Sequence, residues 1–492
     1  MGGNSIMKIL MLDLDTLRPD HLSCYNYPRL TSPTIDSIAS DGTRFENYYC
    51  SDAPCLPSRA ALLTGRFGIH NGAVNHGGLA ADLRLQGINR GFKDQQLENN
   101  IFNIFRKAGM HTASISPFAE RHSSYWFCAG FNEIINTGKS GNETADEILP
   151  SVTNWLERNA DNGDWFLHVN FWDPHTPYRA PIEMGNPFEN DPAPEWITEE
   201  VFAEHLKHVG PHSTNEIGMY DDESPADRPR QLGKAKNMAE MKQVIDGYDV
   251  DILYMDSKIK VIIDLLKDKG LYNDMAIIIT SDHGENLGEL GIYAEHGTAD
   301  QITTRIPMII KWPDMKENYV DTGLHYNLDL CPTLAELLKV KPYEKWDGQS
   351  YAAALKDGAD CGREYLVLSQ CAHVCQRSIR FDDYIYIRTY HDGYHLFKKE
   401  MLFNLKEDYF EQNNLASIRP DLCGIACRYL TDWQQNMMMT ADSDIDPLWT
   451  VMLEGGPYHA KGSLPNYCKR LEATGRAEGA KLLLTKHPRE FK

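Results

Sequence analysis

The first 350 residues alternate short apolar runs with longer stretches of helical periodicity, an order typical of a largely parallel sheet covered by helices. Runs of apolar residues predict buried strands at 8–12, 112–115, 165–170, 276–280 and 307–310. Periodic segments between them predict helices at 143–159 and 238–269. We therefore expect an α/β fold with a mostly parallel central sheet between two layers of helices.

The pattern changes twice further along the chain. Residues 180–235 are rich in Pro, Asp, Glu and Asn with weak periodicity, which predicts an elaborated loop that shapes a pocket. From Ser378, apolar and polar residues alternate with period two around the turn His391-Asp392-Gly393, which predicts a small antiparallel sheet. We therefore expect a catalytic α/β domain at 1–375 and a C-terminal subdomain with this sheet and helices at 376–492.

Composition and charge exclude several classes of protein. The chain has 492 residues, 42% hydrophobic and 24% charged, which are ordinary values for a globular protein. A net charge of −21 disfavours nucleic acid and anionic membranes as partners, and no apolar run approaches the roughly 18 residues of a membrane span. The start, MGGNSIMKIL, lacks a basic segment followed by a long apolar one, so we expect a cytoplasmic protein. The pattern fits a monomer and a homo-oligomer equally well.

The cysteines do not predict a disulfide framework. There are eleven, an odd number spread over a long chain. Cys371/Cys375 and Cys423/Cys427 have i, i+4 spacing and could approach each other on helices. Neither pair forms the C-x-x-C unit typical of metal or redox sites, so we favour an ordinary structural role for both.

One cysteine lies in a segment that predicts chemistry, the string CLPSRAALLTGR at residues 55–66. Pro57 suits the first turn of a helix, and the following alanines and leucines propagate it. Cys55 is therefore expected at a helix N-terminus, where free amides and the helix dipole stabilise negative charge. Arg59 and Arg66 add positive charge nearby. The alternative is a buried cysteine before an ordinary helix.

Polar residues at two strand ends strengthen the first interpretation. Asp15 follows the first predicted strand, and Asp282 and His283 follow the strand at 276–280. In open α/β sheets, ligands bind beyond the carboxyl ends of the strands. Carboxylate and imidazole ligands beside an anion-binding helix start predict a divalent-cation site that would neutralise a tetrahedral oxyanion.

With these motifs the chain resembles the formylglycine-dependent sulfatases of the alkaline phosphatase superfamily. Cys55 to Arg59 fit the family signature C-x-P-S-R, and Thr64-Gly65-Arg66 fits its continuation. Further landmarks follow in the family's order over most of the chain: YDVDILYMDSKI at 248–259, TSDHGENLGE at 280–289, Arg305-Ile306-Pro307, and LFNLKEDYFEQNNLA at 402–416. The resemblance implies an alkaline-phosphatase-like fold and hydrolysis of sulfuric esters.

The resemblance also implies that a maturation enzyme oxidises Cys55 to formylglycine. One hydroxyl of its hydrated aldehyde would attack sulfur, helped by a cation and Arg59. Loss of the proton from the second hydroxyl would then expel sulfate and restore the aldehyde, an exit that serine lacks.

The family's metal ligands correspond here to Asp15, the modified Cys55, Asp282 and His283. Two positions depart from the common pattern: Asp15-Thr16 replaces a pair of aspartates, and Asp282-His283 replaces Asp-Asn. A carboxylate is lost and an imidazole gained, which weakens the case for Ca²⁺ relative to Mn²⁺. Asp13 either supplies the missing carboxylate or has a structural, hydrogen-bonded role.

Histidines dominate the remaining positions implied by the resemblance. His175, in FWDPHTPY, corresponds to a histidine that contacts the sulfate or leaving-group oxygen, and His296 stands where many relatives have a sulfate-binding lysine. The usual G-K-W-H-L-G element is replaced by SPFAERHSSYWF, in which Arg121 and His122 could bind substrate or be a solvated pair. His76 could also reach the oxyanion.

The sequence is compatible with three functions. The first is hydrolysis of a sulfate monoester of a sugar or aryl alcohol, with His175 or His296 protonating the departing oxygen. The second is hydrolysis of phosphonate monoesters or phosphodiesters, whose enzymes share formylglycine and often an aspartate–histidine metal pair. The third is a silent binder of sulfated glycans in which Cys55 stays a thiol, and the complete signature argues against it.

Overall fold

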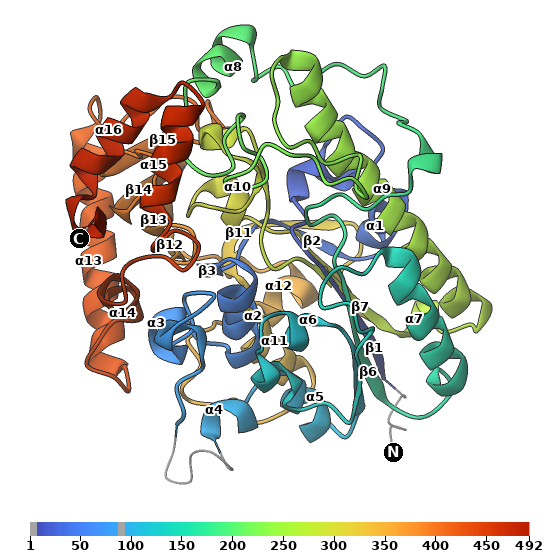
Figure 1. The fold of residues 1–492 in the computed structure, drawn as a ribbon. Coiled ribbons are helices and arrows are strands. Elements are labelled where there is room, and N and C mark those ends of the chain that lie inside the picture. Colours follow the sequence, from blue (N-terminus) through green and yellow to red (C-terminus); the bar gives the residue numbers. More distant parts are fainter. Residues whose placement is uncertain (1–6, 87–93, 492) are drawn as a thin grey trace.

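An eight-stranded sheet runs through the centre of the computed structural model, which describes residues 7–86 and 94–491 (Figure 1). The strand order is β11-β2-β10-β7-β1-β6-β4-β5, and only β10 runs antiparallel to its neighbours. The strands are β1 (Lys8–Leu14), β2 (Thr43–Tyr49), β4 (His111–Ile115), β5 (Glu133–Ile135), β6 (Trp165–Phe171), β7 (Ala276–Thr280), β10 (Met308–Lys311) and β11 (Tyr319–Tyr326). The expectation of a mostly parallel sheet is confirmed.

Helices cover both faces of this sheet. One face packs against α1 (Pro33–Ser40), α7 (Ala145–Asn159) and α9 (Met238–Asp268). The other packs against α2 (Cys55–Thr64), α5 (Ile101–Lys107), α11 (Leu330–Leu337) and α12 (Ala352–Asp357). In β1, Leu10 and Leu12 enter the first layer, whereas Ile9 and Met11 enter the second, because successive side chains of a strand point to opposite faces. A strand buried on both sides therefore has to be apolar throughout, as the sequence pattern indicated.

A second, smaller sheet follows in the C-terminal part, with the order β15-β14-β13-β12-β3. Its strands are β12 (Tyr365–Gln370), β13 (Cys375–Phe381), β14 (Tyr384–His391), β15 (Glu400–Asn404) and the two-residue β3 (Asp52–Ala53). Helix α13 (Pro420–Thr440) packs against it, followed by α14 (Pro447–Leu453), α15 (Leu464–Ala473) and α16 (Ala477–Lys486). Strand β3 joins this sheet by parallel pairing with β12, and it ends two residues before Cys55.

The predicted turn at His391-Asp392-Gly393 connects β14 to β15, which pair antiparallel as expected. The sheet has a further reversal, not predicted, at Asp382–Asp383, between the paired residues Phe381 and Tyr384 of β13 and β14. Asp382 has a φ of 43°, a left-handed conformation that aspartate tolerates in tight turns. At the predicted turn, His391 ends β14, and Asp392 is held by side chains of the C-terminus. The domain boundary near residue 375 stays a prediction.

The segment 180–235 is mainly irregular, with one short α-helix, α8 (Glu199–His205), and one 3-10 turn at Ile182–Met184. It is held to the C-terminal helices by Glu216, whose buried carboxylate pairs with Arg470 and Arg476. This anchoring fixes the loop close to the C-terminal part of the chain.

All eleven cysteines are free thiols. Cys423 and Cys427 lie on α13 as expected, whereas Cys371 lies in the loop before β13 and not on a helix. Within 7–86 and 94–491, no helix combines the length and apolarity needed to cross a bilayer. Residues 1–6, which carry part of the expectation about the N-terminal leader, lie outside the described residues.

We expect the C-terminus to loosen at alkaline pH, because its anchor is a protonated histidine. Burial alone would lower the pKa of His487, but Asp392 and Glu490 raise it to about 9. His391, Tyr394 and Lys486 also face this group. Since the folded pKa exceeds the unfolded value of about 6.5, the stabilisation is complete below pH 6.5 and is lost as the pH rises through 9.

The measurement is the melting temperature between pH 6.5 and 10 for the protein and its His487→Gln variant. The variant should melt lower than the parent at pH 6.5, and the difference should shrink towards zero at pH 10. A difference that does not change with pH would contradict this prediction.

Candidate active site

The polar ends of two neighbouring strands meet at the start of α2. Strands β1 and β7 are parallel and adjacent, with Asp13 opposite Thr280, so the residues that follow them reach the same edge of the sheet. Asp15 comes after β1, and Asp282 and His283 come after β7. The structure therefore brings together the four predicted metal ligands, with Cys55 as the fourth.

Helix α2 starts at Cys55, as predicted, and every residue in it is buried. Pro57 has no N–H to lose in the first turn, and the Ser58 amide donates to the Pro54 carbonyl at 3.0 Å. The helix ends at Gly65, whose φ of +64° is left-handed, and a Cβ there would lie 2.6 Å from the Trp346 ring. Both ends of the helix are thus fixed, and Cys55 has a defined position.

Cys55 and the strand-end residues form a compact group. The Cys55 Sγ lies 3.0 Å from His283 Nε2, and the nearest ligand atoms of Asp15, Cys55, Asp282 and His283 all lie within 4.8 Å of one another. The backbone amides of Thr16 and His283 donate to Asp282 Oδ1 at 3.2 and 3.0 Å, and the Ser58 hydroxyl donates to the Asp282 carbonyl. The ligand atoms are therefore held in place by the surrounding backbone.

Arg59 lies among three carboxylates in this group. Its guanidinium donates to Asp13 at 2.9 Å, to Asp15 at 3.0 Å and to Asp282, all fully buried. One cation against three carboxylates leaves two negative charges in excess in a buried site, which is costly. Burial and the neighbouring carboxylate of Asp282 accordingly raise the pKa of Asp15, and Asp15 Oδ1 has no partner among the described residues.

These observations fit a bound divalent cation. It would supply the two missing positive charges and give the orphaned Asp15 oxygen a partner. The donor set combines two carboxylates, an imidazole and the side chain of residue 55, which hard and borderline metal ions both accept.

Asp13 was predicted either to bind the cation or to have a structural, hydrogen-bonded role, and its contacts support the structural role. Both of its carboxylate oxygens bind Arg59, and His168 Nε2 lies 3.4 Å from Oδ2. Burial by itself would raise the pKa of Asp13, but Arg59 and His168 lower it to about 2. Asp13 therefore stays charged and orients Arg59, and it is not among the residues grouped around Cys55 as ligands.

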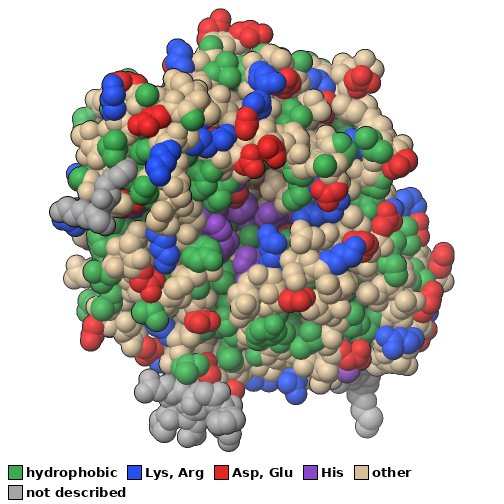
Figure 2. Space-filling view, viewed as in Figure 1, with side chains coloured by type: hydrophobic (Ala, Val, Ile, Leu, Met, Phe, Trp, Pro, Cys, Tyr) green, Lys and Arg blue, Asp and Glu red, His purple; other side chains and the backbone are tan. Residues whose placement is uncertain are grey.

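A pocket of about 450 Å³ opens above Cys55 and is lined mainly by histidines. Figure 2 shows histidine side chains gathered in a hollow of the molecular surface. The predicted catalytic and substrate-binding residues all reach it, except Arg59, which lies beneath it: Cys55, His76, Arg121, His122, His175 and His296. Their functional roles remain predictions.

His175 and His296 present one ring nitrogen each to the pocket. His175 Nδ1 lies 2.5 Å from the Thr176 carbonyl, so it carries the proton and leaves Nε2 free. His296 Nε2 lies 2.9 Å from Glu295 Oε1, and its Nδ1 is buried with no partner among the described residues. Burial, with His296 and Arg179, lowers the pKa of His175, so this ring is a neutral acceptor until an anion binds nearby.

The predicted substrate-binding residues lie next to one another in the lining of this pocket. His76 Nδ1 lies 3.0 Å from His459 Nε2, and the His76 and His122 rings are 5.0 Å apart. Arg121 stacks over Trp172 at 5.7 Å. Burial, followed by neighbouring charges, lowers the pKa of both histidines. Arg121 is thus the fixed positive charge that reaches the pocket.

Several pocket residues were not predicted from the sequence: His212, Met219, Glu295, His373, Tyr458 and His459. His212 comes from the loop at 180–235, and His373 and His459 come from the C-terminal part. They lie far apart in the chain with no common spacing, so only the general prediction that these two regions shape the pocket pointed to them.

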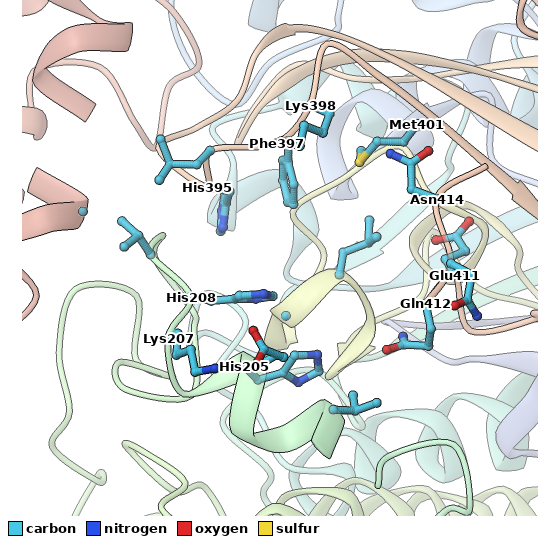
Figure 3. Close-up of a pocket in the computed structure, with 18 of the residues that line it drawn as sticks. His205, Lys207, His208, His395, Phe397, Lys398, Met401, Glu411, Gln412 and Asn414 are labelled. Carbon is cyan, nitrogen blue, oxygen red and sulfur yellow. Dashed lines mark hydrogen bonds and ion pairs between the residues drawn. The ribbon is translucent and has the colours of Figure 1, made fainter. Parts of the chain in front are cut away.

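Another cavity, of about 690 Å³, lies between α8, the segment at 395–403 and α16 (Figure 3). His205, His208 and His395 line it, with Lys207 and Lys398 nearby. None of the predicted site residues lines this cavity; those that line a pocket lie in the smaller one above Cys55.

Comparison with known proteins agrees with this geometry. The sulfatase family model matches residues 8–340. The choline-sulfatase of Rhizobium meliloti (strain 1021) is 24% identical over 436 residues, 79% of this chain and 78% of the relative. The solved structure of BT4656 with its substrate, D-glucosamine-2-N,6-O-disulfate, has a TM-score of 0.68 at 20% identity and covers 90% of this chain and 99% of that one.

The phosphonate monoester hydrolase of Agrobacterium radiobacter is also similar, with a TM-score of 0.64 at 18% identity over 87% of this chain and 95% of that one. These likenesses confirm the alkaline-phosphatase-like fold. Together with the match over residues 8–340, they establish that the chain belongs to the sulfatase family of hydrolases and is a sulfatase enzyme.

Proposed function

We propose that this enzyme hydrolyses a sulfate monoester of a sugar or an aryl alcohol, using a formylglycine made from Cys55 and one divalent cation, Ca²⁺ or Mn²⁺. The observation that carries the proposal is the position of Cys55. Its side chain lies at the N-terminus of α2, 3.0 Å from His283, at the floor of a pocket of about 450 Å³. That placement suits a nucleophile that attacks an anionic ester.

Asp15, Asp282, His283 and residue 55 would hold the cation. When bound, a divalent cation stabilises negative charge on the ester oxygens and lowers the pKa of a nearby hydroxyl. The hydrate of the aldehyde supplies one hydroxyl for attack on sulfur and a second whose proton is lost when sulfate leaves. Arg59 holds the acidic ligands in register through its contacts with Asp13, Asp15 and Asp282.

His175 and His296, which line the pocket above Cys55, would donate and accept protons during the reaction. A bound anionic ester favours the protonated form of His175, whose Nε2 can then donate to the leaving oxygen. His296 is oriented by Glu295, and its unpartnered Nδ1 suits it to accept the proton that is released when sulfate leaves. The atom balance closes, because water adds to the aldehyde and one sulfate and one alcohol leave.

The alternative is hydrolysis of a phosphonate monoester or a phosphodiester. The pair Asp282-His283 favours it, and the likeness to the Agrobacterium radiobacter hydrolase adds weight. The histidine-lined pocket and the likeness to sulfatases over most of the chain favour the sulfate ester.

A substrate panel tests the proposal: sulfated sugars, an aryl sulfate and a phosphonate monoester, assayed with full-length enzyme made in a host that has the maturation enzyme. We expect kcat/KM to be highest for a sulfate ester, to fall to background with a chelator, and to return on adding Ca²⁺ or Mn²⁺. A higher kcat/KM for the phosphonate would establish the alternative instead.

Intact mass distinguishes both enzymes from a silent glycan binder. Conversion of the Cys55 thiol to the aldehyde lowers the mass by about 18 Da. We expect this decrease in active preparations. The fraction of chains that show it should be proportional to the turnover number measured per total chain. An unmodified chain that binds sulfated sugars and releases no sulfate would be such a binder.

A further inference from the structure

A second group of metal-binding side chains lies in the wall of the same pocket, apart from the ligands beside Cys55. His212, Glu295 and His373 are all buried, and one ligand atom of each lies within 4.8 Å of the others. They come from three separate parts of the chain: the loop at 180–235, β9 (Tyr293–Glu295) and the loop before β13. Two imidazoles and one carboxylate are the donor set of many zinc sites.

The hydrogen bonds of His212 determine which ring nitrogen is free. His212 Nδ1 lies 2.8 Å from the Ile217 carbonyl, which can only accept, and 3.3 Å from the Met219 backbone N–H, which can only donate; the shorter contact favours a proton on Nδ1. In the neutral ring, Nε2 is then unprotonated and has a lone pair that can accept a hydrogen bond or bind a metal ion. It lies 3.1 Å from Glu295 Oε2, an oxygen that is also an acceptor, and none of the described residues hydrogen bonds to it. Two buried acceptors at this distance repel each other unless a proton on Nε2 or a metal ion lies between them.

The spacing of the three donors suits a tetrahedral ion. Zinc bonds of roughly 2.0–2.1 Å place neighbouring ligand atoms about 3.3–3.4 Å apart on a tetrahedron. His212 Nε2 lies 3.1 Å from Glu295 Oε2, close to that value, whereas the 3.7 Å contact of His373 Nε2 is to the other oxygen, Oε1. One ligand atom of each residue still lies within 4.8 Å of the others, so binding at Oε2 requires the His373 ring to move towards that oxygen. The carbonyl of Ile217 holds His212, and the ring of His459 stacks on His373 at 4.2 Å, so the two imidazoles are oriented from behind.

We propose that His212, Glu295 and His373 bind a second metal ion, Zn²⁺, in the wall of the pocket above Cys55. Three protein ligands leave the fourth position of a tetrahedral ion open, and all three residues line the pocket that Cys55 also lines. The open position therefore faces the space for the substrate. If the proposed function holds, an oxygen of the bound ester's alcohol part, such as a carboxylate or a second sulfate, ligates Zn²⁺ there.

Glu295 connects this site to the proposed chemistry. One carboxylate oxygen, Oε2, faces His212, while the other, Oε1, lies 2.9 Å from His296 Nε2. Zinc bound at Oε2 leaves Oε1 to orient His296. The second ion would thus position both the substrate and a histidine that faces Cys55.

The first test measures metal binding without turnover. Full-length protein is dialysed against excess Ca²⁺, to fill the site beside Cys55, and then titrated with Zn²⁺. We expect one tightly bound Zn²⁺ per chain, and a loss of affinity on the order of 100-fold or more in His212→Gln and in His373→Gln. His122→Gln is the matched control, since His122 lines the same pocket but packs on His76, Phe118 and Trp172, and this variant should keep the Zn²⁺.

Spectroscopy of the unaltered protein gives a second readout that does not depend on whether the variants fold. Co²⁺ in place of Zn²⁺ should give the intense visible bands of a four-coordinate site, and X-ray absorption at the zinc edge should show two imidazoles. Absence of bound Zn²⁺ at Ca²⁺ saturation, or binding that survives in the double variant His212→Gln/His373→Gln, would overturn the second site. Because neither readout needs hydrolysis, failure of the proposed function gives a separate result.

The substrate arm compares KM for a singly charged aryl sulfate and a disulfated sugar, with and without Zn²⁺. Zinc should lower KM for the disulfated sugar and leave that for the aryl sulfate unchanged. An equal effect on both esters would contradict the role of the open position in binding substrate.

Discussion

Replacing Cys55 with alanine is expected to reduce turnover by about 10⁶-fold, the scale of losing a catalytic nucleophile. The proposed attacking oxygen exists only on the group made from this side chain, and the remaining pocket residues cannot replace it. The fold should survive, because Cys55 is a small buried residue at the start of α2 and the change removes a single sulfur atom. The measurement is kcat/KM for the best ester of the panel, with the melting temperature as the check on folding.

A serine variant at the same position makes the prediction sharper. Cys55→Ser keeps one hydroxyl and lacks the second, so it should accept the sulfuryl group once and stay sulfated, with a mass increase of one SO₃ and no sustained turnover. Cys331→Ala is the matched control, since Cys331 is a buried thiol whose Sγ lies 3.3 Å from the Leu62 carbonyl of the same helix. That control should keep nearly full activity. Sustained turnover by the alanine variant would refute the assignment of Cys55.

Arg59→Gln is expected to lower the free energy of unfolding by about 3–5 kcal/mol when divalent cations are chelated, the usual cost of removing one partner from a buried ion pair. Asp13, Asp15 and Asp282 would then face one another without their common cation. Proton uptake limits the loss, because burial and Asp282 already raise the pKa of Asp15. Activity should fall as well, since the ligands would lose their fixed positions.

Urea unfolding with a chelator and with millimolar Ca²⁺ or Mn²⁺ measures this effect. Added cation should restore part of the lost stability in the variant, because it binds only the folded site. Arg419→Gln is the control: Arg419 pairs with Asp421 on the surface, and its loss should leave the unfolding midpoint unchanged. An Arg59→Gln variant as stable as this control would mean that the three carboxylates do not share a buried charge balance.

The central sheet and the grouping of the candidate cation ligands beside Cys55 could be predicted from the sequence because local pattern determines both. A strand buried on two faces has to be an apolar run, and the strand at 276–280 was located without error. Its polar ends then identify the site, since parallel strands deliver Asp15 and Asp282 to one edge.

Features that depend on long-range packing could not be predicted in this way. His212, Glu295, His373 and His459 meet only because the loop at 180–235 and the C-terminal part fold over the pocket. The reversal at Asp382-Asp383 was missed because only His391-Asp392-Gly393 was interpreted as a turn, although both are good turn sequences and the structure has a turn at each. A two-residue strand such as β3 carries no periodicity at all.

The pairing of β3 with β12 makes the position of Cys55 depend on the C-terminal third of the chain. Asp52 and Ala53, just before Cys55, pair with Ser369 and Gln370. These two partners lie outside the segment 8–340 that matches the family. A fragment that ends at residue 340 would keep every predicted cation ligand. It would lose β12, the strand that pairs with the residues just before α2. Changes in the C-terminal part of this chain are therefore expected to shift Cys55 even when no residue beside it is substituted.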